Sequence, residues 1–154
     1  ERPLHLGAVI ARPSASEHSE ILNVLSAYGL PLGEAFQLRD DMLGIFGDPE
    51  TTGKPAGDDL REGKRTVLMA MTMEKASDAA RAELSAHLGR PDLSPEKIES
   101  LRALIIETGA VADVEKLIDR LGEESVAAAN SAAINENARP FLLALAETAI
   151  RRSY

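Results

Sequence analysis

The sequence contains no cysteine and no tryptophan, and aromatic residues make up only 3% of its 154 residues. Without cysteine, the chain can form neither a disulfide nor a thiolate metal site. Extended runs of β-branched residues are also missing, whereas Ala, Leu, Glu and Arg are abundant, and this composition favours helices over strands. The absences therefore predict an all-α protein without disulfide or metal-thiolate chemistry.

Positive charge is scarce as well. The chain has 17 Lys and Arg against 25 Asp and Glu, which gives a formal net charge of −8. Nucleic acid and anionic lipid surfaces attract clustered Lys and Arg, so neither is expected as the main partner. No apolar run approaches the length that spans a bilayer, and residues 1–5 lack the features of a signal peptide. We therefore expect a cytoplasmic protein with no membrane span.

The length suits a single domain, and the 44% hydrophobic content can form a core. Apolar residues recur with helical spacing over most of the chain. The patterns predict helices over about 14–29, 31–46, 65–76, 78–88, 94–108, 111–135 and 140–151. Ser14 and Glu17 would cap the first of these helices, Gly29 would end it, and Pro31 would begin the second. Residues 47–64, rich in Gly and Pro, are expected to form an irregular loop.

A polar stripe lies on the second predicted helix. Helical spacing places Gly33, Gln37, Asp40, Asp41 and Gly44 on one face of it. Adjacent carboxylates at the C-terminal end of a helix face an unfavourable dipole and would be stabilised by a cation. Mg²⁺ prefers a few carboxylates combined with water and substrate phosphates, and the glycines leave room for a ligand. A solvated helix face is the alternative interpretation of this stripe.

The predicted loop that follows the stripe is basic. It places Lys54, Arg61, Lys64 and Arg65 close in sequence to the carboxylates. Carboxylates, glycines and lysines together suit a phosphate group bridged by a metal ion. The spacing of the glycines and Pro55 do not fit a phosphate loop of the Walker type.

Several short strings in this region resemble the second aspartate-rich region of the trans-isoprenyl diphosphate synthases, the polyprenyl synthetases. They are residues 33–44 (GEAFQLRDDMLG), 47–49 (GDP), 53–55 (GKP), 57–60 (GDDL) and 63–66 (GKRT). The resemblance implies an all-α helical bundle of the isoprenoid synthase type around a deep cavity. It also implies a prenyltransferase that condenses isopentenyl diphosphate with an allylic prenyl diphosphate. Three Mg²⁺ ions would assist the departing diphosphate, an allylic cation would form, and the enzyme would be a homodimer.

The resemblance also assigns roles by position. Asp40 and Asp41 would bind Mg²⁺, Asp40 directly and Asp41 in support. The expected substrate-binding side chains are Phe36, Gln37, Lys54 and Lys64. No catalytic residue beyond these metal and diphosphate binders is expected. One position departs from the family, because the third Asp of its motif is Gly44 here.

Nothing in the chain resembles the first aspartate-rich motif of the family. We therefore expect residues 1–154 to be the C-terminal portion of a single synthase domain, inactive without the N-terminal half of the same enzyme. Two alternatives stay open. A non-catalytic regulatory subunit would have no need for Gln37, Asp40 and Lys54, and a terpene cyclase of related fold is less similar in the loop that ends at Lys64.

Overall fold

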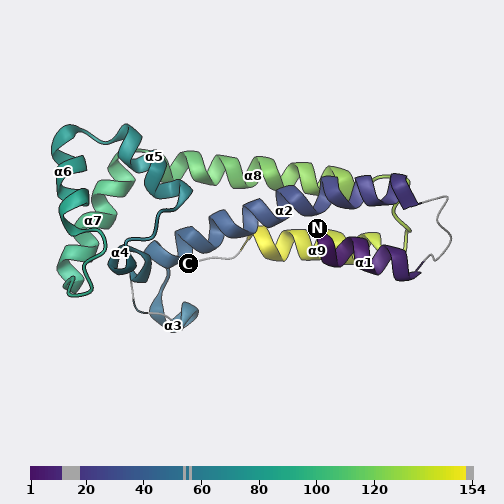
Figure 1. Cartoon of the computed structure of the whole chain (residues 1–154), viewed down its shortest axis with the longest axis horizontal. Helices are drawn as coiled ribbons and strands as arrows, with labels where there is room; N and C mark the ends of the chain where they lie inside the picture. Colours follow the sequence, from purple (N-terminus) through teal and green to yellow (C-terminus); the bar gives the residue numbers. More distant parts are fainter. Residues whose placement is uncertain (12–17, 54, 56, 152–154) are drawn as a thin grey trace. The chain divides into compact units, whose positions relative to one another are not determined.

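The computed structural model describes residues 1–11, 18–53, 55 and 57–151. These residues contain helices, turns and coil but no strand, which confirms the all-α prediction for this part of the chain. Among them, no helix is both long enough and apolar enough to cross a membrane. The helices are α1 (Arg2–Ala11), α2 (His18–Phe46), α3 (Pro49–Thr52), α4 (Asp58–Glu62), α5 (Val67–Lys75), α6 (Asp78–His87), α7 (Pro95–Glu107), α8 (Ala110–Ala129) and α9 (Arg139–Ile150) (Figure 1).

The chain divides into two compact units. The described residues of unit 1 fall within 1–37 and 117–151, and those of unit 2 fall within 38–116. Unit 1 therefore contains α1, α9, the first part of α2 and the last part of α8. Unit 2 contains α3 to α7 with the remaining turns of α2 and α8.

The core of unit 1 is formed by helix faces with small residues. Tyr28 and Leu32 of α2 pack with Ala129 of α8 and with Ala146 and Ala149 of α9. Alanine at these contacts lets the helices approach closely without losing side-chain entropy. The Tyr28 ring is fully buried, and its hydroxyl donates to the carbonyl oxygen of Leu142 at 2.8 Å. Apolar burial and side-chain hydrogen bonds, such as those of Tyr28 with Leu142 and of His5 with Ser26, thus join the helices of this unit.

The core of unit 2 draws on every longer helix in it. Its larger fully buried apolar side chains are Met42 and Ile45 of α2, Leu60 of α4, Leu68 of α5, Leu84 of α6, Ile98, Leu101 and Ile105 of α7, and Val114 of α8. The N-terminal caps that fix α5, α6 and α7 are short polar side chains. Thr66, Ser77 and Ser94 each accept a hydrogen bond from a backbone N–H in the first turn of its helix. The helices predicted near 65–76, 78–88 and 94–108 are therefore confirmed.

The prediction that Gly29 ends a helix was wrong. α2 continues through both Gly29 and Pro31 to Phe46. Gly29 serves a tertiary contact, because a Cβ at this position would lie 2.9 Å from the Cδ1 atom of Leu4 in α1. The missing side chain thus permits the close approach of α1. Ser14 and Glu17, the predicted cap, lie outside the described residues.

Two further boundaries differ from the sequence patterns. α8 ends at Ala129 instead of Asn135, because the Asn130 side chain donates to the Val126 carbonyl oxygen and turns with i to i+3 bonds follow. The segment 47–64, predicted to be irregular, contains α3 and α4. Asp48 caps α3 through its side chain, and Gly57 and Gly63 flank α4. Local hydrogen bonds decided both differences.

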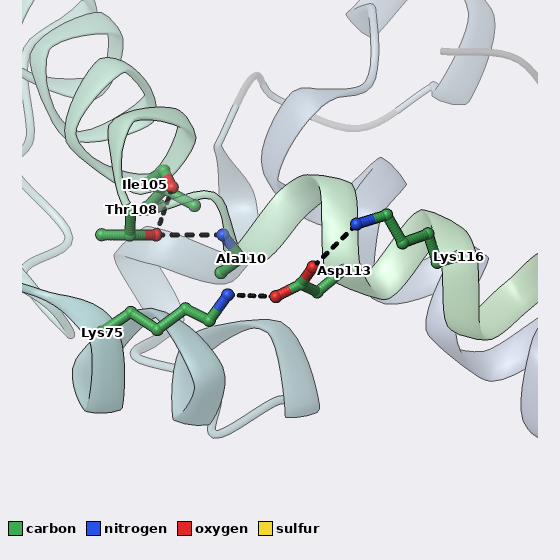
Figure 2. Close-up of polar contacts among 6 residues, drawn as sticks. All are labelled: Lys75, Ile105, Thr108, Ala110, Asp113 and Lys116. Atoms are coloured by element: carbon green, nitrogen blue, oxygen red, sulfur yellow. Dashed lines mark hydrogen bonds and ion pairs between the residues drawn. The ribbon is translucent and has the colours of Figure 1, made fainter.

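Polar contacts between elements hold the ends of α2 and α8 in unit 2. Arg102 of α7 donates from Nε to the Ile45 carbonyl oxygen at 2.7 Å, in the last turn of α2. That carbonyl group has no partner within its own helix, so the guanidinium satisfies it and complements the helix dipole. At the start of α8, the Asp113 carboxylate pairs with Lys75 of α5 and Lys116 (Figure 2). The Thr108 hydroxyl bridges α7 and α8 by donating to the Ile105 carbonyl oxygen and accepting from the Ala110 N–H (Figure 2).

Candidate functional site

Three charged side chains of unit 2 meet at the predicted site. The Lys64 ammonium lies 3.0 Å from Oδ1 of Asp41 on α2 and 3.2 Å from Oδ2 of Asp59 on α4. Both carboxylate side chains are buried, at 8% and 6% exposure, whereas the Lys64 side chain is 39% exposed. We call these three residues the Lys64 cluster. It joins α2 to the segment that the sequence analysis predicted to be basic.

The pKa of Lys64 is raised above its ordinary value. Burial by itself lowers that pKa, but the hydrogen bonds to Asp41 and Asp59 and the charges of the two carboxylates outweigh it. The side chain is therefore an ammonium at neutral pH. An ammonium has three N–H donors, and two of them are used by these carboxylates.

Gly44 lies against the Lys64 cluster. A Cβ at Gly44 would be 2.3 Å from both Cγ and Oδ2 of Asp59 and 2.6 Å from its Oδ1. No side chain at position 44 can coexist with the Asp59 carboxylate in this place. Position 44 is where the resembled motif has its third Asp. In this chain, the carboxylate of Asp59 from α4 lies against that position instead.

The other predicted site residues lie on α2 or outside the described residues. Asp40 is partly exposed and precedes the buried Asp41 directly. Phe36 is 42% exposed and Gln37 is exposed, both about one helical turn before the carboxylates. Lys54 lies outside the described residues. The structure therefore brings Asp41 and Lys64 into contact and leaves Asp40 accessible on the helix that carries both aspartates.

The family model of the polyprenyl synthetases matches residues 1–105. The chain belongs to the polyprenyl synthetase family.

Curated members of the family are similar over most of the chain. A geranylfarnesyl diphosphate synthase from Aeropyrum pernix is 38% identical over 111 residues, which are 72% of this chain and 32% of the relative. A geranylgeranyl diphosphate synthase from Mycobacterium tuberculosis is 34% identical over 148 residues, which are 96% of this chain and 40% of the relative. The chain thus spans about a third to two fifths of the length of these relatives.

A solved structure shows the same fold. The geranylgeranyl pyrophosphate synthase from Corynebacterium glutamicum, complexed with isoprenyl diphosphate and magnesium, matches with a TM-score of 0.90 and 45% identity. The match covers 99% of this chain and 42% of that protein. The geranylgeranyl pyrophosphate synthetase from Pyrococcus horikoshii matches with a TM-score of 0.81 at 23% identity. The predicted isoprenoid synthase fold is thereby confirmed for this polyprenyl synthetase chain.

The donor set of this polyprenyl synthetase chain fits Mg²⁺ only in part. The described residues contain no group of three or more acidic, His or Cys side chains that could enclose a metal ion. Asp40 is partly exposed, whereas Asp41 is buried and bonded to Lys64. An ion on Asp40 would therefore need phosphate or water oxygens as further ligands, which is the coordination that Mg²⁺ prefers. Among the described residues, Asp40 could therefore supply one ligand of a magnesium site, but no closed site is formed there.

Sequence reasoning missed two residues that shape this site. Asp59 was not singled out, although it precedes Lys64 by five residues in the same GDDL and GKRT strings. Glu115 of α8 accepts two hydrogen bonds from the Arg39 guanidinium, both at 2.7 Å. The Arg39–Glu115 pair holds α2 against α8 at the residue that directly precedes Asp40. The two residues are 76 positions apart, so no local pattern could have predicted the contact.

Proposed function

We propose that this chain contributes diphosphate-binding residues to the active site of a prenyltransferase. The reaction would condense isopentenyl diphosphate with an allylic prenyl diphosphate. The allylic carbon–oxygen bond breaks, the diphosphate leaves with the electron pair, and an allylic cation remains. The double bond of isopentenyl diphosphate attacks that cation, and a proton is then lost. The similarity to geranylgeranyl and geranylfarnesyl diphosphate synthases supports this assignment.

One observation carries the proposal. The Lys64 ammonium is held at two N–H donors by buried carboxylates, while its side chain stays partly exposed. The third donor can therefore bind an oxygen of a diphosphate at a fixed position, which lowers the entropy cost of binding. On α2, the neighbouring Asp40 would hold a Mg²⁺ ion.

Each predicted residue has a task in this proposal. Mg²⁺, expected as three ions in a complete site, supplies positive charge that neutralises the departing diphosphate. Asp40 and Asp41 bind and support the metal, and Asp41 also orients Lys64. The side chains that contact substrate are Lys54 and Lys64 at the allylic diphosphate and Phe36 and Gln37 at the isoprenoid. Fixed charge is thereby placed where negative charge develops.

The chain would work as part of a larger assembly. We propose that it functions together with the N-terminal half of the same enzyme, as a cytoplasmic homodimer, and that it is inactive alone. Unit 1 has apolar surface that suits a protein partner, since Ile10 and Phe141 are 70% and 77% exposed. An apolar groove of about 360 Å³ in the same unit is lined by Leu4, Ile21 and Leu25 among others. These features support a partner beyond the chain itself.

The proposal is tested by substitution in the complete synthase. Asp40→Ala and Lys54→Ala should each lower the rate of Mg²⁺-dependent prenyl transfer about a hundredfold or more, because charge at the leaving group is lost. Asp58→Ala is the matched control for Asp40→Ala, because both changes remove one carboxylate from a partly exposed residue. This control should retain the wild-type rate of prenyl transfer. Unchanged rates for both site variants would support a regulatory subunit instead. Cyclised hydrocarbon products would support a terpene cyclase.

The inactivity of the isolated chain needs its own assay. Native mass spectrometry followed by denaturation identifies every polypeptide in the purified material. Prenyl transfer by material that contains this chain alone would contradict the proposed need for a second half.

A further inference from the structure

We propose that Asp59 is a positioning residue for Lys64, and that position 44 is glycine because only a hydrogen atom leaves room for the Asp59 carboxylate. The inference rests on the proposed function, since it explains how that ammonium is aimed at a diphosphate. It concerns Asp59, which received no role from the sequence patterns, and Gly44, which was expected to leave room for a ligand.

The contact with Gly44 leaves the Asp59 carboxylate little freedom. The side chain is short, starts in the first turn of α4 and is 6% exposed. Both carboxylate oxygens and Cγ lie within 2.6 Å of where a Cβ at position 44 would be. A methyl group there would have to push the whole carboxylate away, and the hydrogen bond from Lys64 would be lost with it. Gly44 and Asp59 therefore act as a pair.

Lys64 needs a second anchor because its side chain is flexible. Four rotatable carbons carry the ammonium, and one carboxylate would let it swing about a single hydrogen bond. Asp41 lies on α2 and Asp59 on α4, so the two carboxylates hold the ammonium from different elements. With both bonds made, the direction of the third N–H donor is fixed. Asp59 would thus act on a ligand through Lys64 and not by direct contact.

Whether loss of the Asp59 charge weakens or tightens diphosphate binding distinguishes a positioning role from a purely electrostatic one. The one-to-one complex of Mg²⁺ and diphosphate is still an anion, so removal of a nearby carboxylate should tighten its binding if charge alone matters. If Asp59 positions Lys64, the same change should weaken binding. Asp59→Asn removes the charge with little change in shape.

The test is isothermal titration of the protein with magnesium diphosphate. Asp59→Asn should raise the Kd about tenfold, because the neutral amide oxygen is a weaker acceptor than the charged carboxylate and holds the ammonium less firmly. In a Lys64→Ala background it should have no further effect, because the residue through which it acts is gone. Asp58→Asn, the matched control for charge, should leave the Kd unchanged. An unchanged or lowered Kd for Asp59→Asn, or an equal effect in the Lys64→Ala background, would overturn the proposal.

A second measurement separates this inference from the proposed function. The Lys64 ammonium protons should exchange slowly enough to be seen by NMR in the wild type and in Asp58→Asn, and should be lost in Asp59→Asn. If the wild type binds no magnesium diphosphate but this pattern is found, the proposed function fails and the positioning role stands. If the slow exchange survives in Asp59→Asn, the positioning role fails whatever the protein binds.

The role of Gly44 is tested by a double-mutant cycle. Gly44→Ala should lower the melting temperature in the wild type, because the methyl group displaces the Asp59 carboxylate. The same change should cost nothing in an Asp59→Ala background, where the space is empty and alanine favours the helix. Equal penalties in both backgrounds would show that Gly44 is not there to make room for Asp59.

Discussion

Different kinds of interaction stabilise the interior of each of the two units of this chain. In unit 1, fully buried Tyr28 and small alanines join four helices through apolar contact. Ion pairs of unit 1 such as Arg120–Glu124 and Glu147–Arg151 lie between residues only four apart in the sequence. Unit 2 also has such local pairs, for example Lys116–Asp113, but further ion pairs in it join separate elements.

The difference follows from the length of the elements. Long helices with apolar faces bury enough surface to associate without directional contacts. Unit 2 is built from shorter helices and loops, and it places the Lys64 cluster between two of them. Its other cross-links include Arg39–Glu115, Glu83–Lys97 and Lys75–Asp113. Directional charged contacts fix positions more closely than apolar burial does, and the unit that carries the candidate site relies on them.

The largest expected effect tests the apolar packing of unit 1. Tyr28→Ala should lower the free energy of unfolding by about 3–5 kcal/mol, because it leaves a cavity at a fully buried aromatic position. Tyr28→Phe should cost only about 1 kcal/mol, the loss of one hydrogen bond to Leu142. Urea unfolding of both variants measures the two values. Similar costs for the two changes would mean that the hydrogen bond, and not the packing, holds this unit.

The second prediction concerns a cross-link of unit 2. Glu115→Ala should cost about 2–3 kcal/mol, because it leaves the Arg39 guanidinium, whose side chain is only 10% exposed, without its bidentate partner. Glu124→Ala, which removes an exposed pair within one helix of unit 1, should cost about 0.5 kcal/mol or less. Urea unfolding of both variants gives the comparison. Equal losses of unfolding free energy would show that ion pairs between elements stabilise the protein no more than ion pairs within one helix.

The smallest effect is a pH dependence in unit 2. Hydrogen bonds from Lys75 and Lys116, together with their charges, hold the pKa of Asp113 below its usual 3.8. A lowered pKa in the folded state stabilises the protein above the pKa of the unfolded state, and this contribution is lost as the pH falls through the folded value. Asp113→Asn should therefore flatten the decline in unfolding free energy below about pH 4. Asp119→Asn is the control on the same helix. If the unfolding free energy of Asp113→Asn declines with falling pH as steeply as that of the wild type, Asp113 does not contribute to this pH dependence.

Local signals in the sequence predicted much of this structure. Ser94 and Pro95 marked the start of α7, and Pro140 marked α9 to within a residue. The polar stripe with Asp40 and Asp41 was placed on a helix, as the structure has it. Caps, apolar spacing and dipole effects act within a few residues, so they can be read from neighbouring positions.

The failures of prediction share a cause. Gly29 has the local signature of a helix end, but its role is to admit Leu4 of α1. Position 44 looks like a missing acid within its motif, yet in space it is filled by Asp59. In both cases the missing side chain serves a neighbour that is distant in sequence, and nothing in the local pattern identifies that neighbour.

The sequence by itself determined the helical class, most helix boundaries, the net acidity and the motif that marks the polyprenyl synthetase family. These depend on composition and on interactions within about a turn of helix. Only the tertiary structure decided that Asp41 is buried against Lys64, that Asp59 completes the cluster, and that Arg39 anchors α2 to Glu115. Such contacts join residues up to 76 positions apart, and packing of the whole unit is what brings them within hydrogen-bond distance.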